Sequence, residues 1–218
     1  MSFQIKTIVS MPFAENTYVI WLDGHTDCLV IDPGLEPDLI HEFLADQMLK
    51  PVAILNTHGH SDHIAGNGDV KTVYPEAPLI IGVNDAPMLL DPDLNLSRQY
   101  GFDIISPPAD QIVREGEQLL FAGLTLDIFD CPGHSPGHVV FYLKEFGVLI
   151  GGDVLFRGSI GRTDFPGGSF EQLAVSIRNK LYTLPAETVV YPGHGPTTKI
   201  GHERRTNRFV TDLNMATE

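Results

Sequence analysis

Thr57-His58-Gly59-His60-Ser61-Asp62-His63 is the stretch of this chain that decides its fold. It holds three imidazoles and one carboxylate within six residues, and these groups suit zinc, iron and manganese. His58 and His60 are two residues apart and can point to one side of an extended turn. Asp62 and His63 are adjacent and must diverge. The spacing therefore suits two metal positions rather than one.

Three further candidate ligands stand later in the chain. They are His134 in GHSPGH (133–138), Asp153 in GGDVLF (151–156) and His194 in PGHG (192–195). Together they disfavour the alternative interpretation of the first cluster, which is a polar helix start with incidental histidines. Each candidate follows a predicted strand, and loops at strand ends are held by a rigid sheet yet open to solvent. We therefore expect them to meet at one site.

Short apolar strands alternate with amphipathic stretches along the chain. We predict strands at 3–9, 17–21, 28–31, 52–55, 79–81, 119–121, 124–129, 139–143, 148–151 and 188–191. We predict helices at 37–48, 64–73, 169–184 and 201–213, with Ser169 as the cap of the third. Residues 83–108, rich in Asp, Pro and Asn, predict a short helix and then an irregular surface excursion.

Length and composition indicate one globular domain, residues 1–218. No apolar run approaches the ~18 residues that cross a bilayer, and the N-terminus has no secretory pattern, so we expect a cytoplasmic protein. Cys28 and Cys131 predict two reduced interior thiols. Only 14 Lys and Arg stand against 28 acidic residues, which disfavours a nucleic-acid partner. We expect no membrane partner, and a monomer or small homo-oligomer.

The four motifs THGHSDH, GHSPGH, GGDVLF and PGHG resemble the metallo-β-lactamase superfamily. The resemblance implies an α/β fold, the αβ/βα sandwich, in which two mixed β-sheets face each other with helices outside. It also implies two metals along one edge of the sheets. The ligands carried over are His58, His60 and His134 for the first metal, Asp62, His63 and His194 for the second, and Asp153 as the bridge.

The segment Ser159-Ile160-Gly161-Arg162-Thr163-Asp164-Phe165-Pro166-Gly167-Gly168 is similar to the glyoxalase II branch of that superfamily. This branch cleaves hydroxyacyl-glutathione thioesters, and the length of the chain resembles its small single-domain bacterial members. Longer members carry an added helical domain whose basic residues hold the glutathione carboxylates. The resemblance thus implies a small-molecule thioester substrate whose carrier is glutathione or a related thiol.

The chemistry of such a two-metal site suits thioester hydrolysis. Two divalent cations, zinc by default with iron or manganese as alternatives, would produce a bridging hydroxide near neutral pH. The remaining positive charge would stabilise the oxyanion, and Asp62 could briefly hold the proton of the water. We therefore expect Asp62 and Asp153 to be catalytic. A thiolate leaving group needs little proton help, because thiols have a pKa near 8.5.

Several residues have roles that the sequence leaves open. We interpret His138 as a hydrogen-bonding neighbour of the ligands. Arg162 and Asp164 predict a charge pair that braces the loop after Asp153 or meets a substrate carboxylate, and Tyr142 is a candidate for the substrate groove.

Two other functions remain open. A persulfide dioxygenase of the same fold would use one iron on His58, His134 and Asp153, although Ile160 favours the hydrolase. Lactone or β-lactam hydrolysis would use the same two-metal chemistry.

Overall fold

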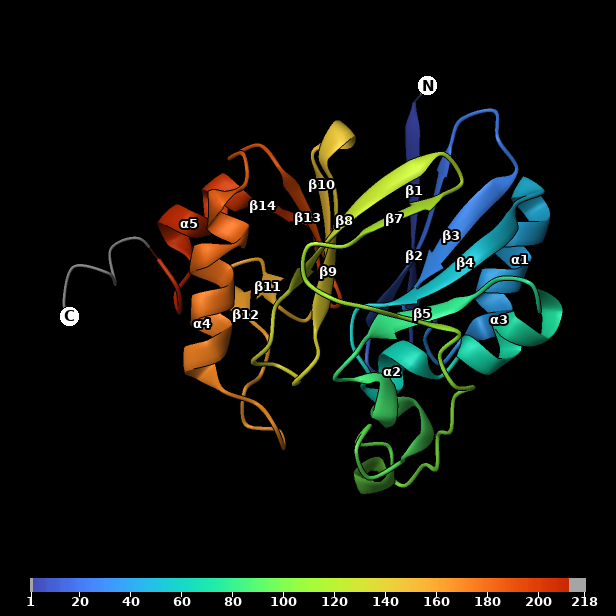
Figure 1. Cartoon of the computed structure of the whole chain (residues 1–218), viewed down its shortest axis with the longest axis horizontal. Helices are drawn as coiled ribbons and strands as arrows, with labels where there is room; N and C mark the ends of the chain where they lie inside the picture. Colours follow the sequence, from blue (N-terminus) through green and yellow to red (C-terminus); the bar gives the residue numbers. More distant parts are fainter. Residues whose placement is uncertain (1, 212–218) are drawn as a thin grey trace.

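The structure of this chain is a computed structural model that describes residues 2–211. Two six-stranded mixed sheets face each other, with helices on their outer sides (Figure 1). This confirms the expected αβ/βα sandwich. The first sheet runs in the order β1 (Phe3–Ser10), β2 (Glu15–Leu22), β3 (Asp27–Ile31), β4 (Lys50–Asn56), β5 (Leu79–Gly82), β6 (Gln111–Val113). Its strands are antiparallel from β1 to β3 and parallel from β3 to β6.

The second sheet has one parallel pair, β10 with β13, and antiparallel pairs elsewhere. Its order is β14 (Thr198–Lys199), β13 (Val189–Pro192), β10 (Val148–Gly152), β9 (Val139–Leu143), β8 (Leu124–Asp130), β7 (Gln118–Phe121). A short hairpin, β11 (Leu155–Phe156) with β12 (Ser159–Ile160), follows β10.

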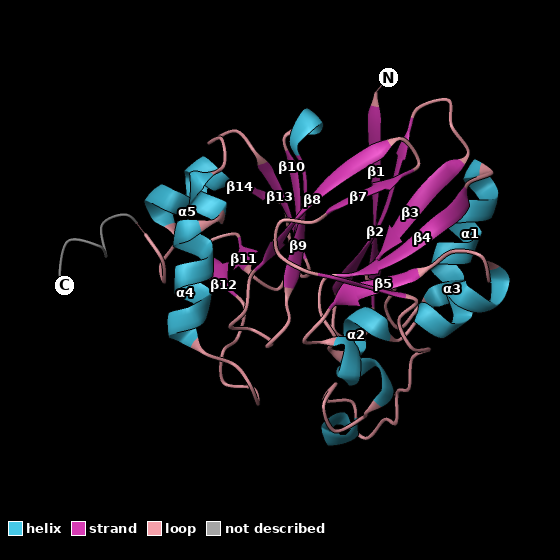
Figure 2. Cartoon of the chain, viewed as in Figure 1, coloured by secondary structure: helices cyan, strands magenta, loops and turns pink. Residues whose placement is uncertain are grey.

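Helices cover the outer faces of both sheets (Figure 2). The first sheet carries α1 (Pro37–Gln47) and α3 (Asn67–Val73), and the second carries α4 (Phe170–Asn179) and α5 (Ile200–Thr206). The single-turn helix α2 (Ser61–Ile64) lies at the edge where β4 ends. Among residues 2–211, no helix is both long and apolar enough to cross a membrane.

Side-chain alternation explains why both faces of each sheet are apolar. Successive residues of a strand point to opposite faces. In β9, Val139 and Phe141 pack between the sheets, whereas Val140 and Tyr142 pack under α4. In β2, Tyr18 and Ile20 likewise join the central core, and Val19 joins the outer one. Strands covered on both sides become nearly continuous apolar runs, which is why the sequence predicts them well.

The structure corrects several predicted boundaries. The predicted helix 64–73 covers the end of α2, at Ile64, and the whole of α3, which begins at Asn67; between them the backbone N–H of Gly66 donates to the carbonyl of Pro33 at 2.8 Å instead of continuing α2. The predicted helix 169–184 ends at Asn179 and is followed by a 3-10 turn, Leu181–Thr183, while Ser169 caps it as expected. Strands β6, β14 and the β11–β12 hairpin were not predicted.

The last predicted helix, 201–213, was too long. Helix α5 ends at Thr206, because the buried Asn207 turns the chain and accepts from the backbone N–H of Phe209 and Val210. Positions 212 and 213 of that prediction lie outside the described residues. The excursion at 83–108 holds two 3-10 turns, Ala86–Leu90 and Arg98–Tyr100.

Candidate metal centre

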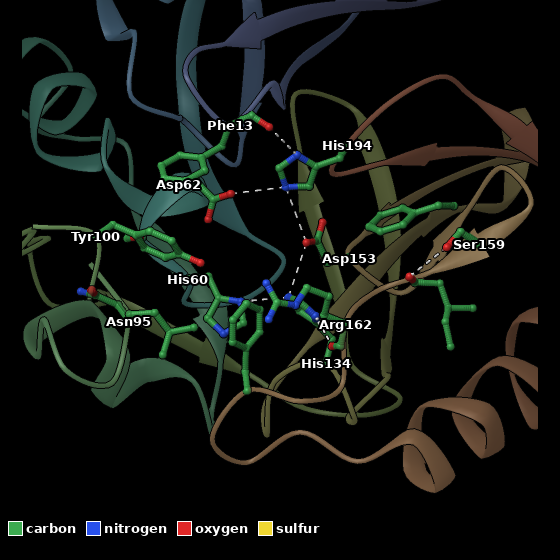
Figure 3. Close-up of a pocket in the computed structure, with 15 residues that line it drawn as sticks. Phe13, His60, Asp62, Asn95, Tyr100, His134, Asp153, Ser159, Arg162 and His194 are labelled. Atoms are coloured by element: carbon green, nitrogen blue, oxygen red, sulfur yellow. Dashed lines mark hydrogen bonds and ion pairs between the residues drawn. The ribbon is translucent and has the colours of Figure 1, made fainter. Parts of the chain in front are cut away.

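The loops after β4, β8, β10 and β13 meet at the edge of the two facing sheets and bring the predicted ligands together (Figure 3). His58 and His60 follow β4, and Asp62 and His63 stand on α2. The other three follow β8, β10 and β13 respectively: His134, Asp153 and His194. The three ligand candidates from the second sheet thus lie opposite the four that follow β4 of the first sheet.

The first group of ligand atoms comes from His58, His60 and His134, and these atoms lie within 4.8 Å of one another. His60 Nδ1 is 2.9 Å from His134 Nε2. His58 Nε2 is buried and has no hydrogen-bond partner among the described residues. A buried nitrogen without a partner is costly, so this atom fits a metal ligand.

The second group comes from Asp62, His63 and His194, again with ligand atoms within 4.8 Å of one another. His194 Nε2 lies 3.3 Å from Asp62 Oδ2 and 3.4 Å from His63 Nε2. Two imidazoles and one carboxylate form a donor set typical of zinc, iron and manganese sites.

Asp153 lies between the two groups. Its Oδ2 is 3.4 Å from His134 Nε2 and 3.6 Å from His194 Nε2, and its Oδ1 is 3.6 Å from His63 Nε2. Oδ1 is also buried without a hydrogen-bond partner among the described residues. One carboxylate therefore reaches both groups, as a bridging ligand requires.

The charge environments of the two groups differ. Burial lowers the pKa of His58 and His60, and neighbouring imidazoles lower it further. These rings are therefore neutral and offer lone pairs. Burial also disfavours the imidazolium of His63 and His194, yet the carboxylates of Asp62 and Asp153 raise the pKa of both above the ordinary value. The second group is thus rich in negative charge, which favours a bound cation.

Hydrogen bonds to the opposite ring nitrogens orient three of the imidazoles. His134 Nδ1 lies 2.7 Å from the carbonyl oxygen of Arg162, and His194 Nδ1 lies 3.1 Å from that of Phe13. His63 Nδ1 lies 3.1 Å from Asp32 Oδ2. Because each partner is an acceptor, the Nδ1 atoms carry protons, and the Nε2 atoms are the ones on which a metal could take the place of a proton.

Asp32 is a functional residue that the sequence reasoning missed. Besides His63, it accepts from the backbone N–H and the hydroxyl of Thr57, both at 2.7 Å. Its oxygens also lie close to His58 and His63, as a third set of potential ligand atoms. They are occupied by these donors, so Asp32 orients the ligands. The available signal was an acidic residue directly after a buried strand, at Asp32-Pro33-Gly34.

Asp85, from the excursion at 83–108, was also missed. It is fully buried, and burial raises the pKa of its carboxyl. It accepts from the backbone N–H of Gly59 at 3.1 Å, from the hydroxyl of Ser135 at 2.5 Å, and from the backbone N–H of Gly137 at 2.6 Å. Asp85 therefore ties the loop of His58 and His60 to the loop of His134.

The family of the chain follows from comparison with known proteins. Residues 11–194 match the Metallo-beta-lactamase superfamily. The chain belongs to this superfamily.

Individual relatives give more detail. Hydroxyacylglutathione hydrolase GloC of Haemophilus influenzae is 36% identical over 209 residues, which cover 94% of this chain and 97% of GloC. The crystal structure of BLEG-1 B3 metallo-beta-lactamase has a TM-score of 0.91 at 39% identity and covers 95% of this chain and 100% of that one. TTHA1623 in a di-iron-bound form has a TM-score of 0.84 at 36% identity and covers 94% of this chain and 100% of that one.

A cavity of about 300 Å³ opens beside the ligands of this superfamily member. Five of the seven ligand candidates line it, all except His58 and His63, and Phe13, Phe156, Ile160 and Phe165 contribute apolar walls. The excursion at 83–108 contributes Tyr100, together with Asn95 and Leu96. The sequence did not predict that this excursion reaches the site.

Tyr142 does not line this cavity, contrary to the expectation. It is 5% exposed and packs with Leu173 and Ile177 on the outer side of the second sheet. The even-numbered positions of β9 face α4, and both faces of the strand are apolar, so the sequence could not show which side Tyr142 takes.

Arg162 and Asp164 form the expected pair. Arg162 Nε and Nη2 donate to the two carboxylate oxygens of Asp164, both at 2.9 Å. The pair stands exposed at the cavity mouth, and only Arg162 lines the cavity. The contact between this loop and a ligand is made by the Arg162 carbonyl, which accepts from His134. Among the described residues, the hydrogen bonds and ion pair of these two side chains join them to each other and not to a metal ligand.

Proposed function

We propose that this chain is a hydrolase that holds two divalent metal ions and cleaves thioesters of the S-hydroxyacyl-glutathione type. The observation that carries the two-metal part is the position of Asp153, whose carboxylate lies between two groups of three ligand atoms. The di-iron form of TTHA1623, at 36% identity, supports it. The thioester part rests on the likeness to GloC over nearly the whole of both chains.

The proposed ligand roles follow the two groups. His58, His60 and His134 would hold one ion and Asp62, His63 and His194 the other, with Asp153 between them. Zinc suits this donor set, and iron or manganese can use the same ligands. Two bound divalent cations supply a polarised carbonyl and a hydroxide near neutral pH, because metal binding lowers the pKa of water to about 7.

Side chains of this protein would accept the proton of the water and limit access of solvent to the ester. Asp62 lines the cavity, and His63 and His194 outweigh the effect of its burial and hold its pKa below the usual range. It therefore starts as a carboxylate that can accept a proton on Oδ1 or Oδ2. The thiolate leaving group departs without a strong acid, because its pKa is near 8.5. The apolar walls limit water around the reacting ester.

The test incubates the protein with S-lactoylglutathione and measures thiol release with a thiol reagent and oxygen uptake with an oxygen electrode. Element analysis of protein purified without added metal accompanies it. We expect about two metals per chain and thiol release without oxygen uptake. Asp62→Ala and His194→Ala should lower the release by orders of magnitude, because both belong to the second group. Their matched controls, Asp46→Ala and His202→Ala at exposed positions, should retain it. One metal per chain after metal-replete purification would refute the two-metal assignment.

The same preparation separates the alternatives. Oxygen uptake with glutathione persulfide and no thioester cleavage would move the chain to a mononuclear dioxygenase. The second candidate function is β-lactam hydrolysis, favoured by the 39% identity to BLEG-1 B3 metallo-beta-lactamase. A chromogenic β-lactam turned over with a higher kcat/KM than any thioester would support that candidate instead.

A further inference from the structure

The cavity beside the ligands has one fixed cation in its lining, at its mouth, and its other polar lining residues outside the ligands are the uncharged Ser61, Asn95, Tyr100 and Ser159. Within residues 2–211, Arg162 is the only Lys or Arg that lines this cavity. Six other lining residues are apolar or aromatic: Phe13, Leu96, Tyr100, Phe156, Ile160 and Phe165. A substrate arm that extends from the ligand groups therefore meets mainly apolar and aromatic side chains, a few uncharged polar ones, and a single positive charge.

Arg162 is held in place above the metal ligands. Its guanidinium carbon lies 4.2 Å from the centre of the Phe165 ring, a cation–π contact. Phe165 in turn packs edge-on against His60 and His134, with ring centroids 5.2 and 6.0 Å apart. The guanidinium is thus one aromatic ring away from the first group of ligands.

The guanidinium retains donors for a ligand. It carries five N–H bonds, and Asp164 accepts from Nε and Nη2. The Nη1 group is not used by this pair. Tyr100 approaches from the excursion at 83–108, and its hydroxyl points toward the Arg162 side chain (Figure 3). The hydrogen bonds to Asp164 raise the pKa of Arg162, and the nearby Tyr100 adds to the rise.

Tyr100 is itself braced. Its ring packs edge-on against Phe13, with centroids 5.3 Å apart, and the carbonyl of Phe13 accepts from His194. Two loops far apart in the sequence therefore each place one donor at the cavity mouth, and each is anchored to one of the two ligand groups.

We propose that Tyr100 and Arg162 form a subsite for one carboxylate of the substrate, on a short arm that carries no other charge. This inference rests on the proposed thioester hydrolysis and names the class of thiol that carries the acyl group. Glutathione has two carboxylates and one ammonium, whereas the cavity offers one cation. A small thiol with a single carboxylate matches the cavity better.

A matched pair of substrates tests the subsite. S-lactoyl-3-mercaptopropionate and S-lactoyl-3-mercaptopropionamide share the reacting ester and differ only in the terminal group. The wild type should prefer the carboxylate by about tenfold in kcat/KM, the size of one charge-assisted hydrogen-bond network at a partly exposed site. The wild type should also prefer the carboxylate substrate to S-lactoylglutathione, mainly through a lower KM.

Arg162→Met should lower kcat/KM for the carboxylate substrate about tenfold and for the amide substrate no more than about twofold. Arg162→Lys should keep part of the preference, and Tyr100→Phe should weaken it about threefold. Lys199→Met removes an exposed cation that pairs with Glu187 outside this cavity and should leave the preference at the wild-type value. Metal content of Arg162→Met should match the wild type, because the backbone of Arg162, not its side chain, contacts His134.

The outcomes distinguish the two proposals. An equal loss of kcat/KM for the carboxylate and the amide substrate in Arg162→Met would overturn the carboxylate subsite while leaving thioester hydrolysis intact. A wild type that prefers S-lactoylglutathione would do the same. A wild type with two metals that cleaves none of the three thioesters would overturn the proposed function itself.

Discussion

The backbone N–H of Asp153 donates to Nε2 of the fully buried His138 over 3.0 Å. The ring of His138 also stacks on that of His58, with centroids 4.8 Å apart and an interplanar angle of 18°. His138 therefore contacts residues of the metal centre without joining either group of ligand atoms. The acceptor at Nε2 requires the proton at Nδ1, which fixes its tautomer.

His138→Ala should therefore weaken the site without emptying it. We expect a 10- to 100-fold loss of metal affinity or activity, the usual effect of removing an outer hydrogen bond of a metal site. His134→Ala should remove the first metal altogether. Element analysis after dialysis against a weak chelator measures the contrast. If both variants lose metal equally, His138 belongs among the ligands, and its placement outside the two ligand groups is wrong.

Asp32→Asn tests the orientation of His63. The amide keeps the size of the side chain but can no longer accept from all of the three donors that surround it: the His63 ring and two groups of Thr57. Metal affinity of the second group should fall about 10- to 100-fold. Titration with a competing chelator measures it.

The matched control is Asp110→Asn. This half-exposed aspartate also pairs with a cation and a backbone N–H, those of Lys71 and Leu79, but outside the metal centre. It should leave metal affinity unchanged. An Asp32→Asn protein that binds both metals as tightly as the wild type would show that His63 needs no carboxylate partner.

Gly193→Ala should disrupt the bridge between the two groups. A Cβ at Gly193 would lie 2.2 Å from Asp153 Oδ1 and 2.7 Å from His63 Cε1, which no side chain tolerates. The carboxylate must move, so we expect metal content and activity to fall strongly while circular dichroism still shows a folded chain.

Gly68→Ala, in α3, is the control for that substitution. Its Cβ would meet only Pro107 at 3.8 Å, and a helical Gly→Ala change stabilises a protein by about 0.4–1 kcal/mol. Thermal unfolding should show that gain, with metal content unchanged. Full metal occupancy in Gly193→Ala would contradict the placement of Asp153.

The two cysteines should be unreactive in the folded protein. Both are free and buried, as the sequence predicted. Burial raises the pKa of Cys28 to about 12 and that of Cys131 also far above its ordinary value. Because the thiolate is the reactive form, a raised pKa means little reaction at pH 8.

A disulfide reagent should therefore detect no thiol at pH 8 before unfolding and two afterwards. The same reagent can then follow thiol release from a substrate without interference from the protein. Rapid reaction of one thiol in the native state would show that β3 or the loop after β8 opens readily.

The sequence by itself determined the fold class and the seven ligand candidates. His58, His60, Asp62 and His63 lie so close along the chain that local geometry alone brings them near one another, and the other three stand in short glycine-containing motifs at strand ends. Strands buried on both faces are continuous apolar runs, and such runs are visible without knowing what they pack against.

Only the tertiary structure decided which other residues serve the site. Asp32, Asp85 and Tyr100 are single polar residues without a local pattern. Asp32 contacts the ligand His63, Asp85 contacts the loop of His134 through Ser135, and Tyr100 lines the cavity, and each does so from a segment distant in sequence. It also decided that Tyr142 faces α4, because an apolar strand covered on both sides gives no sign of which face is which. Side-chain identity sets what a residue can bind, but packing between distant segments sets what it meets.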